Sequence, residues 1–374
     1  METNFKIGKI EAICAICIIM VNRIILNLPY SIVKNTGVGS PLNLIYLGFL
    51  GLLFILIINK LFEKFPNSDI IDLSEYLGGK SLKLIVSIIF ILFFFLTLFM
   101  TLADFSNLLQ IIYFNNSPAI FVLIFFILAM LISNLIGFRA IIKTICLIVP
   151  FTIISIIVAF FSVSDEFSLF KLTPILGDGA YSIFVNGLSN FFAFSIINFF
   201  FFFKPLLKNS YDFPKVTIYS FIISWSLLFL TIISLLFVFP MTNDGSNINY
   251  LYLLARKITL GDFLQKVDAL FILLWILSIF SYLSVTTFII NSILKKVTHS
   301  SDGNMFSYLI CSALLGICLY PFNISELKFV QTTVYKYFVL ILLFGVSFSI
   351  LLLSNWKFKR KNGGKKWNKN YLFL

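Results

Sequence analysis

Long apolar segments separated by short polar ones make up most of this chain. Ten of the segments are long enough to cross a bilayer, which takes about 20 predominantly apolar residues. They lie at about Ile10–Val33, Leu42–Leu61, Leu82–Ile112, Ala119–Leu135, Ala140–Ser162, Tyr181–Phe203, Val216–Phe239, Val267–Leu294, Phe306–Pro321 and Thr333–Asn355. Backbone polar groups at this depth must be satisfied within helices. The pattern therefore predicts an all-α polytopic membrane protein with ten transmembrane helices in one domain, residues 1–374.

The positions of the cations give these helices an orientation. With the N-terminus in the cytoplasm, 20 Lys and Arg residues fall in cytoplasmic segments and seven in outer segments, which is the bias of the positive-inside rule. Both termini are therefore predicted to be cytoplasmic, and the number of helices to be even. The long outer loop Pro240–Lys266 carries apolar residues near helical spacing. It is expected to hold a helix that either gates an outer vestibule or only lies on the headgroups.

Ten helices divide into two units of five, residues 1–165 and 166–356, and the second unit re-enters the membrane from the opposite side. Inverted repeats of this kind occur in secondary transporters, whose substrate site lies at the midplane beside discontinuous helices. Helices one and six both carry polar or helix-breaking residues inside the membrane: Asn22, Arg23, Asn27 and Pro29 in the first, and Asn186, Gly187, Ser189 and Asn190 in the sixth. We therefore expect broken helices one and six that line a ligand site, although ordinary packing kinks would produce the same pattern.

Two charged residues lie well inside these segments. Arg23 is about 13 residues, or roughly 20 Å, into the first helix, and Asp104 lies in the outer half of the third. A charge near the bilayer centre costs about 2.5–3.5 kcal/mol on insertion scales, so an ion pair between the two would offset both costs. Together with Thr97 and Thr101, this pair either borders the ligand cavity or only fixes the register of two helices.

Hydroxyl side chains cluster in the eighth helix. They are Ser281, Tyr282, Ser284, Thr286 and Thr287. Such hydroxyls either bond back to carbonyls of their own helix or line a hydrated path, and in the second case Ser281 and Ser284 are candidate ligand residues. The 47 phenylalanines, including the run 199–203, are expected to face lipid.

Composition excludes several classes of function. The chain is 60% hydrophobic and 12% charged, against about 45–50% and about 25% in soluble domains, so a water-soluble globule is excluded. The net charge is +12, but seven cations follow the last helix in the tail 357–374, where they suit anionic lipids rather than nucleic acid. There is one histidine, and all five cysteines lie in apolar segments. We therefore expect no metal, no cofactor and no catalytic residues.

Several short strings resemble the spore germination permease family, the integral-membrane B subunit of bacterial endospore germinant receptors. The most specific string runs from Tyr252 through Arg256, Gly261, Phe263 and Asp268 to Trp275. The others are Leu26-Asn-Leu-Pro29, Phe105–Pro118, Gly137–Lys143 and Leu172–Gly177. The resemblance extends from about Lys6 to Trp356, and its strings occur in the family's order.

The resemblance implies a bundle similar to amino acid–polyamine–organocation transporters. Such a subunit binds a small germinant, for example an amino acid, and signals through partner subunits. The implied partners are a second membrane protein and a lipoprotein, and the implied location is the spore inner membrane or the cell membrane. An independent amino-acid secondary transporter is the alternative, because a receptor and a transporter need the same midplane cavity.

Reporter fusions test the predicted orientation. Fusions after Lys208 and after the C-terminal tail are expected to report cytoplasm, and a fusion near Asn247 to report the outside, because the cation asymmetry places those segments there. A cytoplasmic signal at Asn247 would rule out the division into five plus five helices.

Overall fold

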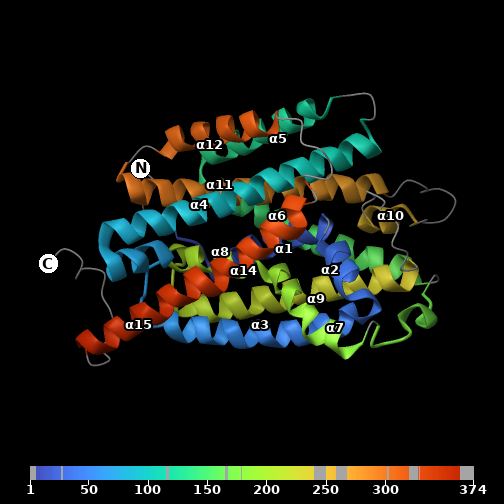
Figure 1. Cartoon of the computed structure of the whole chain (residues 1–374). Coiled ribbons are helices and arrows are strands. Elements are labelled where there is room, and N and C mark those ends of the chain that lie inside the picture. The colour runs from blue at the N-terminus through green and yellow to red at the C-terminus, as the bar shows by residue number, and fades with distance from the viewer. Residues whose placement is uncertain are drawn as a thin grey trace.

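The computed structural model describes residues 6–26, 28–114, 118–164, 167–177, 179–239, 250–257, 268–300, 303–319, 327 and 329–362. In this part the chain is almost entirely helical, and its long helices run side by side in a bundle (Figure 1). Seven helical segments are long and apolar enough to cross a membrane: Leu28–Phe62, Ile70–Ile112, Phe138–Ser162, Ala180–Leu206, Ser210–Val238, Asp268–Thr298 and Val330–Arg360. Shorter apolar helices, α5 (Ala119–Ile136) and α12 (Gly303–Cys318), accompany them. The prediction of an all-α polytopic membrane protein is confirmed.

The first helix is interrupted where the sequence predicts it. Helix α1 (Lys9–Ile25) ends two residues before α2 (Leu28–Thr36) begins. At Leu26 the backbone leaves the helical region, with φ −78° and ψ −137°. Pro29 has no N–H to donate, and in a continuous helix its ring would collide with the carbonyl of Ile25, so the proline accounts for the break. Asn27 lies outside the described residues.

The sixth predicted span is also irregular. It consists of α7 (Ala180–Phe184), the 3₁₀-helix η4 (Asn186–Phe194) and α8 (Ile197–Phe203). Nine residues make an unusually long 3₁₀ segment, because its hydrogen bonds are poorer than those of an α-helix. Asn186, Gly187, Ser189 and Asn190 all lie in η4.

The phenylalanine run 199–203 forms most of α8 and is buried, so the expectation that it faces lipid is wrong. Its rings pack edge-on against α4, with centroids 4.9 Å apart for Phe94–Phe199 and for Phe90–Phe202. Helix α8 lies inside the bundle, where aromatic rings fill the space between neighbouring helices.

The remaining elements complete the bundle. They are η1 (Gly37–Gly39), α3 (Ser40–Phe62), α4 (Ile70–Ile112), α6 (Phe138–Ser162), η3 (Leu169–Leu172), η5 (Lys204–Leu206), η6 (Ser210–Asp212), α9 (Phe213–Val238), α10 (Tyr250–Arg256), α11 (Asp268–Thr298), η7 (Val330–Tyr335), α14 (Lys336–Leu340), η8 (Ile341–Ser347) and α15 (Phe348–Asn362). Both η7 and η8 are π-helical, a form that is rare and often marks functional sites. Helix α10 supplies the helix predicted for the outer loop and packs against α9 and α11.

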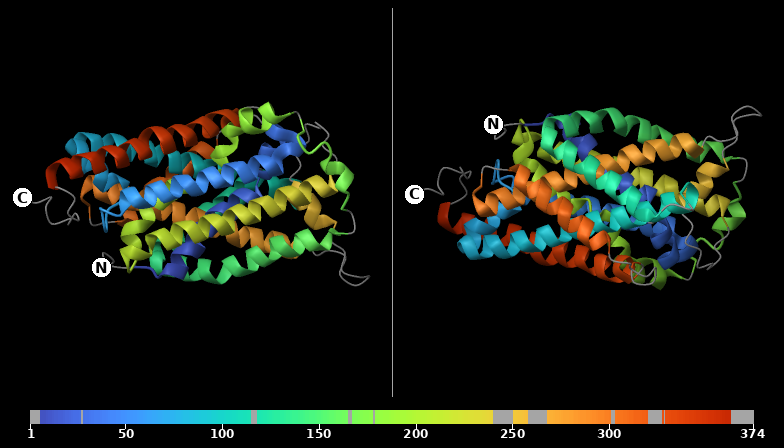
Figure 2. Two further views of the ribbon diagram at one scale, coloured as in Figure 1. Left: turned by 90° about the horizontal axis from the view of Figure 1, so that it is seen from below. Right: turned by 90° about the horizontal axis from the view of Figure 1, so that it is seen from above.

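One end of the bundle is closed by contacts between segments that are distant in sequence. Ile7 makes an isolated parallel bridge to Leu207, with its N–H donating to the Leu206 carbonyl (2.8 Å) and its carbonyl accepting from the Lys208 N–H (2.9 Å). At the same end, Lys204 donates to the carbonyl of Phe62, and the Phe65 ring packs against Phe358 near the end of α15. The described start and end of the chain thus lie at one end of the bundle (Figure 2).

Helix α4 changes direction close to this end, at Gly78 and Gly79. Gly79 has φ +68°, a left-handed conformation that favours glycine. The first piece of α4 therefore ends there, and Lys357 of α15 donates to the carbonyls of Tyr76 (2.7 Å) and Leu77 (3.1 Å). The first cation of the predicted basic tail is thus used to cap a helix end, where a positive charge is favourable.

An ion-pair network joins α4 to α11 at the same end. Asp69 and Asp72 cap the start of α4 by exchanging hydrogen bonds between side chain and backbone N–H. The Lys296 ammonium contacts the carboxylates of both residues, at 2.9 Å from Asp72 Oδ2. Both carboxylates are nearly buried, with 4% and 9% of their side chains exposed. Lys296 therefore neutralises two charges that would otherwise repel each other.

Removing that cation is expected to destabilise the fold. Lys296→Met removes the cation that two nearly buried carboxylates share, and removing one partner of a buried ion pair typically costs about 3–5 kcal/mol. We expect a clearly lower melting temperature for the purified protein in detergent, and partial recovery when Asp69→Asn is added. The matched control is Lys295→Met, which removes an exposed cation one residue away. Equal melting temperatures for Lys295→Met and Lys296→Met would contradict a structural role for the network.

Candidate functional site

Among the described residues, Arg23 contacts an aromatic ring and forms no ion pair with a carboxylate. It lies in the last turn of α1, two residues before the helix ends. Its guanidinium lies over the Tyr335 ring, 4.4 Å from the centroid, and Tyr335 is buried at the end of η7. A cation over an aromatic face contributes about 2 kcal/mol when both groups are desolvated. No sequence pattern singled out Tyr335 as a site residue.

Asp104 is bound by the same π-helix. The side-chain amide of Gln331 donates to the Asp104 carboxylate, and Gln331 precedes Tyr335 by four residues. The predicted ion pair between Arg23 and Asp104 is absent from the described structure, since no N–O distance between them is within 4.0 Å. The two charges still interact over a longer distance. The prediction of a direct pair is therefore wrong, because η7 supplies a partner to each residue.

Three further polar residues near Arg23 and Asp104 come from α1 and α4. Asn22 donates from Nδ2 to Thr101 Oγ1 across 3.4 Å, and both side chains are buried. Thr97 uses its hydroxyl to donate to the Phe94 carbonyl of its own helix (2.7 Å).

The buried Tyr282 of α11 completes the set, because it lies near Thr97, Arg23 and Tyr335. We define the central cluster as Asn22, Arg23, Thr97, Thr101, Asp104, Tyr282, Gln331 and Tyr335.

Some polar atoms of this region have no hydrogen-bond partner within the described protein. They include Asn22 Oδ1 and Arg23 Nε of the central cluster, and both amide atoms of Asn198 on α8. The neighbour of Asn198 in the chain, Phe199, packs against the Tyr282 ring with centroids 6.4 Å apart. Buried polar atoms in proteins are almost always satisfied, so each of these requires a reason.

The polar residues of η4 lie elsewhere, at the far end of α2. Asn190 donates to Asn43 Oδ1 (3.0 Å) and accepts from Asn35 Nδ2 (2.7 Å), which also donates to Ser189 (2.9 Å). Gly187 is needed for this approach, since a Cβ there would lie 2.3 Å from Asn43 Nδ2. We call Asn35, Thr36, Asn43, Gly187, Ser189 and Asn190 the α2–η4 cluster.

The predicted site residues of helices one and six lie in two separate clusters, because those of η4 belong to the α2–η4 cluster. Asn35 lies seven residues beyond the start of α2, or about 10 Å along the helix. Within the described residues, no hydrogen bond or ion pair joins this cluster to the central one. Asn186 is exposed, and its carbonyl accepts from the Ser189 hydroxyl (2.8 Å). Asn186, Gly187, Ser189 and Asn190 were predicted to line a site at the break in helix one. In the structure, Ser189 and Asn190 contact Asn35 near the far end of α2 and not the break itself.

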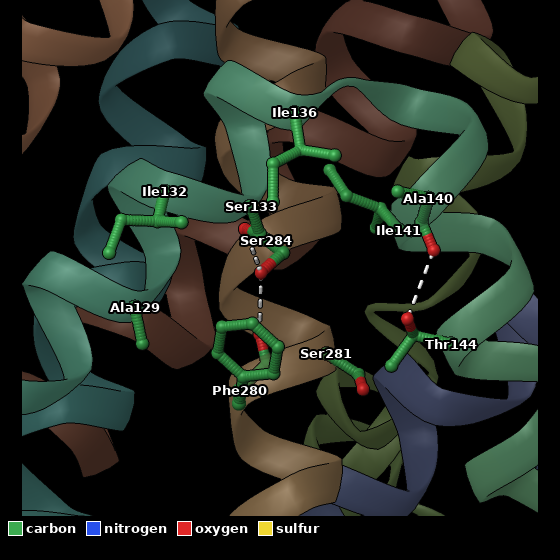
Figure 3. A pocket seen from close by; sticks show the side chains of 10 residues that line it. All are labelled: Ala129, Ile132, Ser133, Ile136, Ala140, Ile141, Thr144, Phe280, Ser281 and Ser284. Carbon is green, nitrogen blue, oxygen red and sulfur yellow. Dashed lines mark hydrogen bonds between the residues drawn. The ribbon is translucent and has the colours of Figure 1, made fainter.

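Ser281 and Ser284 also lie apart from the central cluster, beside a cavity between α5, α6 and α11 (Figure 3). Ser281 donates to the Leu277 carbonyl (2.8 Å) and Ser284 to the Phe280 carbonyl (2.9 Å). Ser284 also contacts the Ser133 hydroxyl at 2.7 Å. Of the two interpretations of the eighth helix, bonding back to its own carbonyls is the one observed for these serines.

Double-mutant cycles test which contacts hold Arg23 and Asp104. We expect a coupling of about 1–2 kcal/mol between Arg23→Met and Tyr335→Leu, and a similar value between Asp104→Leu and Gln331→Leu, because each pair is in direct contact. The coupling between Arg23→Met and Asp104→Leu is expected to stay below about 1 kcal/mol. Thermal unfolding of the purified variants in detergent measures all three values. A coupling of about 3 kcal/mol or more between Arg23 and Asp104 would contradict this arrangement and support a direct ion pair.

Comparison with known proteins assigns the chain to a family. No curated protein matched the chain. The family described as spore germination protein matches residues 6–327, which is most of the sequence and includes every helix from α1 to α12. This family is of the membrane permease or receptor type and is not an enzyme family. The chain is therefore a multi-pass membrane protein that belongs to the spore germination protein family.

Proposed function

We propose that this chain is the membrane subunit of a spore germinant receptor and binds a small nutrient, an amino acid in the simplest case, at the central cluster. The observation that carries the proposal is that Arg23 and Asp104 place opposite charges inside the membrane without forming an ion pair. The carboxylate and ammonium groups of a zwitterionic amino acid complement these two charges. A ligand would also provide partners for Asn22 Oδ1 and Arg23 Nε.

The architecture that we propose is a five-plus-five inverted repeat. Helix α1 is broken from α2 near the start of residues 1–165, and η4 interrupts the corresponding helix near the start of residues 166–356. In inverted-repeat transporters, discontinuous helices at these places line the substrate site. Ten crossings with both termini in the cytoplasm agree with the cation asymmetry and with the shared end of Ile7 and Phe358.

The proposed surroundings follow from family membership and from charge. A second membrane protein and a lipoprotein are the proposed partners, in the spore inner membrane or the cell membrane. Anionic lipids are the proposed contact of the basic tail, because Lys359 and Arg360 are exposed where α15 leaves the bundle.

Gene deletion separates a receptor from a transporter. Spores without the gene are expected to lose the fall in optical density that one or more of the twenty amino acids, offered singly, produces in wild-type spores. Uptake of the same radiolabelled amino acid by growing cells is expected to be unchanged. Lost uptake with unchanged germination would instead support an independent amino-acid transporter.

Site variants in the same spores locate the ligand. Arg23→Gln is expected to raise the amino-acid concentration for half-maximal germination at least tenfold, since losing a charged hydrogen bond costs about 1.5–3 kcal/mol. Arg23→Lys keeps the charge and should have a smaller effect. Asn190→Ala serves as the control, because it lies in the α2–η4 cluster and should lower protein abundance without changing that concentration. An unchanged concentration in Arg23→Gln, at normal abundance, would exclude the central cluster as the site.

A further inference from the structure

We propose that the cavity between α5, α6 and α11 binds the acyl chain of one membrane lipid. The cavity has a volume of about 320 Å³. Figure 3 shows Ile132 and Ile136 of α5, Ile141 of α6 and Phe280 of α11 around it. This site is separate from the central cluster and does not depend on the proposed function.

The polar groups of the lining do not favour water in this cavity. Four hydroxyls border it, and all have partners within the protein. Thr144 donates to the Ala140 carbonyl (3.0 Å) and Ser281 to the Leu277 carbonyl (2.8 Å). Ser133 and Ser284 bond to each other (2.7 Å), and the one that does not donate in this bond can donate to the carbonyl of its own helix, that of Met130 or Phe280. A buried water needs two to four polar partners, whereas cavities lined by apolar groups stay dry and take apolar ligands. The occupant is therefore apolar.

The mouth of the cavity opens on a surface that faces lipid. Ile132 and Ile136 are 55% and 65% exposed. They continue a stripe on α5 that begins with Phe125 and Leu128, which are 63% and 51% exposed and are spaced three to four residues apart. In a membrane protein such a stripe lies against hydrocarbon, so acyl chains are the apolar molecules that reach the mouth.

The volume of the cavity distinguishes an acyl chain from a helix of another protein as its occupant. A cavity of about 150 Å³ is enough for one benzene molecule, so 320 Å³ accommodates a segment of several methylene groups. A transmembrane helix of another protein is about 10 Å wide and is too thick to enter it. An inserted chain would restore the van der Waals contacts that the cavity walls otherwise lack, which is the main source of binding energy within a bilayer.

Photolabelling of the full-length protein tests this proposal. The protein is reconstituted in phosphatidylglycerol and phosphatidylethanolamine vesicles with a trace of phospholipid that carries a diazirine in the middle of one acyl chain. Labelling of Ile132, Ile136 and Phe280 is expected to exceed that of the exposed α3 face by about fivefold, which corresponds to about 1 kcal/mol. The α3 reference residues are Phe49, Leu53 and Leu56, all more than half exposed.

Filling the cavity provides the second arm of the test. Ala140→Leu and Ala129→Leu each add three carbons to the lining, and both are expected to reduce the cavity labelling to the level of α3. The matched control is Ala313→Leu on the exposed side of α12, which should leave the labelling unchanged. Gel-filtration profiles identical to wild type establish that a variant is folded. Equal labelling of cavity and α3 in the wild type, or undiminished labelling in a folded filling variant, would overturn the proposal.

Discussion

The position of the partly buried Arg23 among membrane helices is the constraint on which the centre of the structure depends. A guanidinium at this depth is stable only if the surrounding helices solvate it. Here the solvating group is the face of the Tyr335 ring. Because Arg23 lies in the last turn of α1, this contact requires the end of η7 to lie beside the end of α1. The same segment then brings Gln331 to Asp104, so one π-helix serves a cation and an anion on two other helices. The start of the tenth predicted helix therefore contributes residues to the central cluster.

The two ends of the bundle are held in different ways. At the end that α2 reaches, a chain of amide and hydroxyl hydrogen bonds joins α2 to α3 and η4, and nearly all of its members are buried. Hydrogen-bond networks of this kind gain strength where water is excluded. At the opposite end of the bundle, Lys296 and its two carboxylates join α4 to α11 through an ionic network.

Hydropathy and helix-breaking residues predicted much of this fold from sequence. Apolar length identifies membrane helices directly, and Pro29 forces a break wherever it falls in one. The composition of the central cluster was only partly predictable, because Gln331 and Tyr335 reach it through a π-helical register that no residue pattern encodes. The partners of Asn190 were not predictable for a related reason: its hydrogen bonds depend on how far α2 continues after the break. The buried phenylalanine run shows that hydrophobicity alone does not distinguish lipid from core.

The bridge between Ile7 and Leu207 connects the beginning of α1 to the segment that follows α8. Its two backbone hydrogen bonds both reach the segment 206–208, one from the Ile7 N–H and one to the Ile7 carbonyl, so they resist both sliding and separation of the two segments. Helix α1 ends at the break before α2, and α8 follows η4, so the bridge ties together pieces of the two interrupted helices. A displacement of the start of α1 would therefore act on the segment that follows α8 without passing through the centre of the bundle.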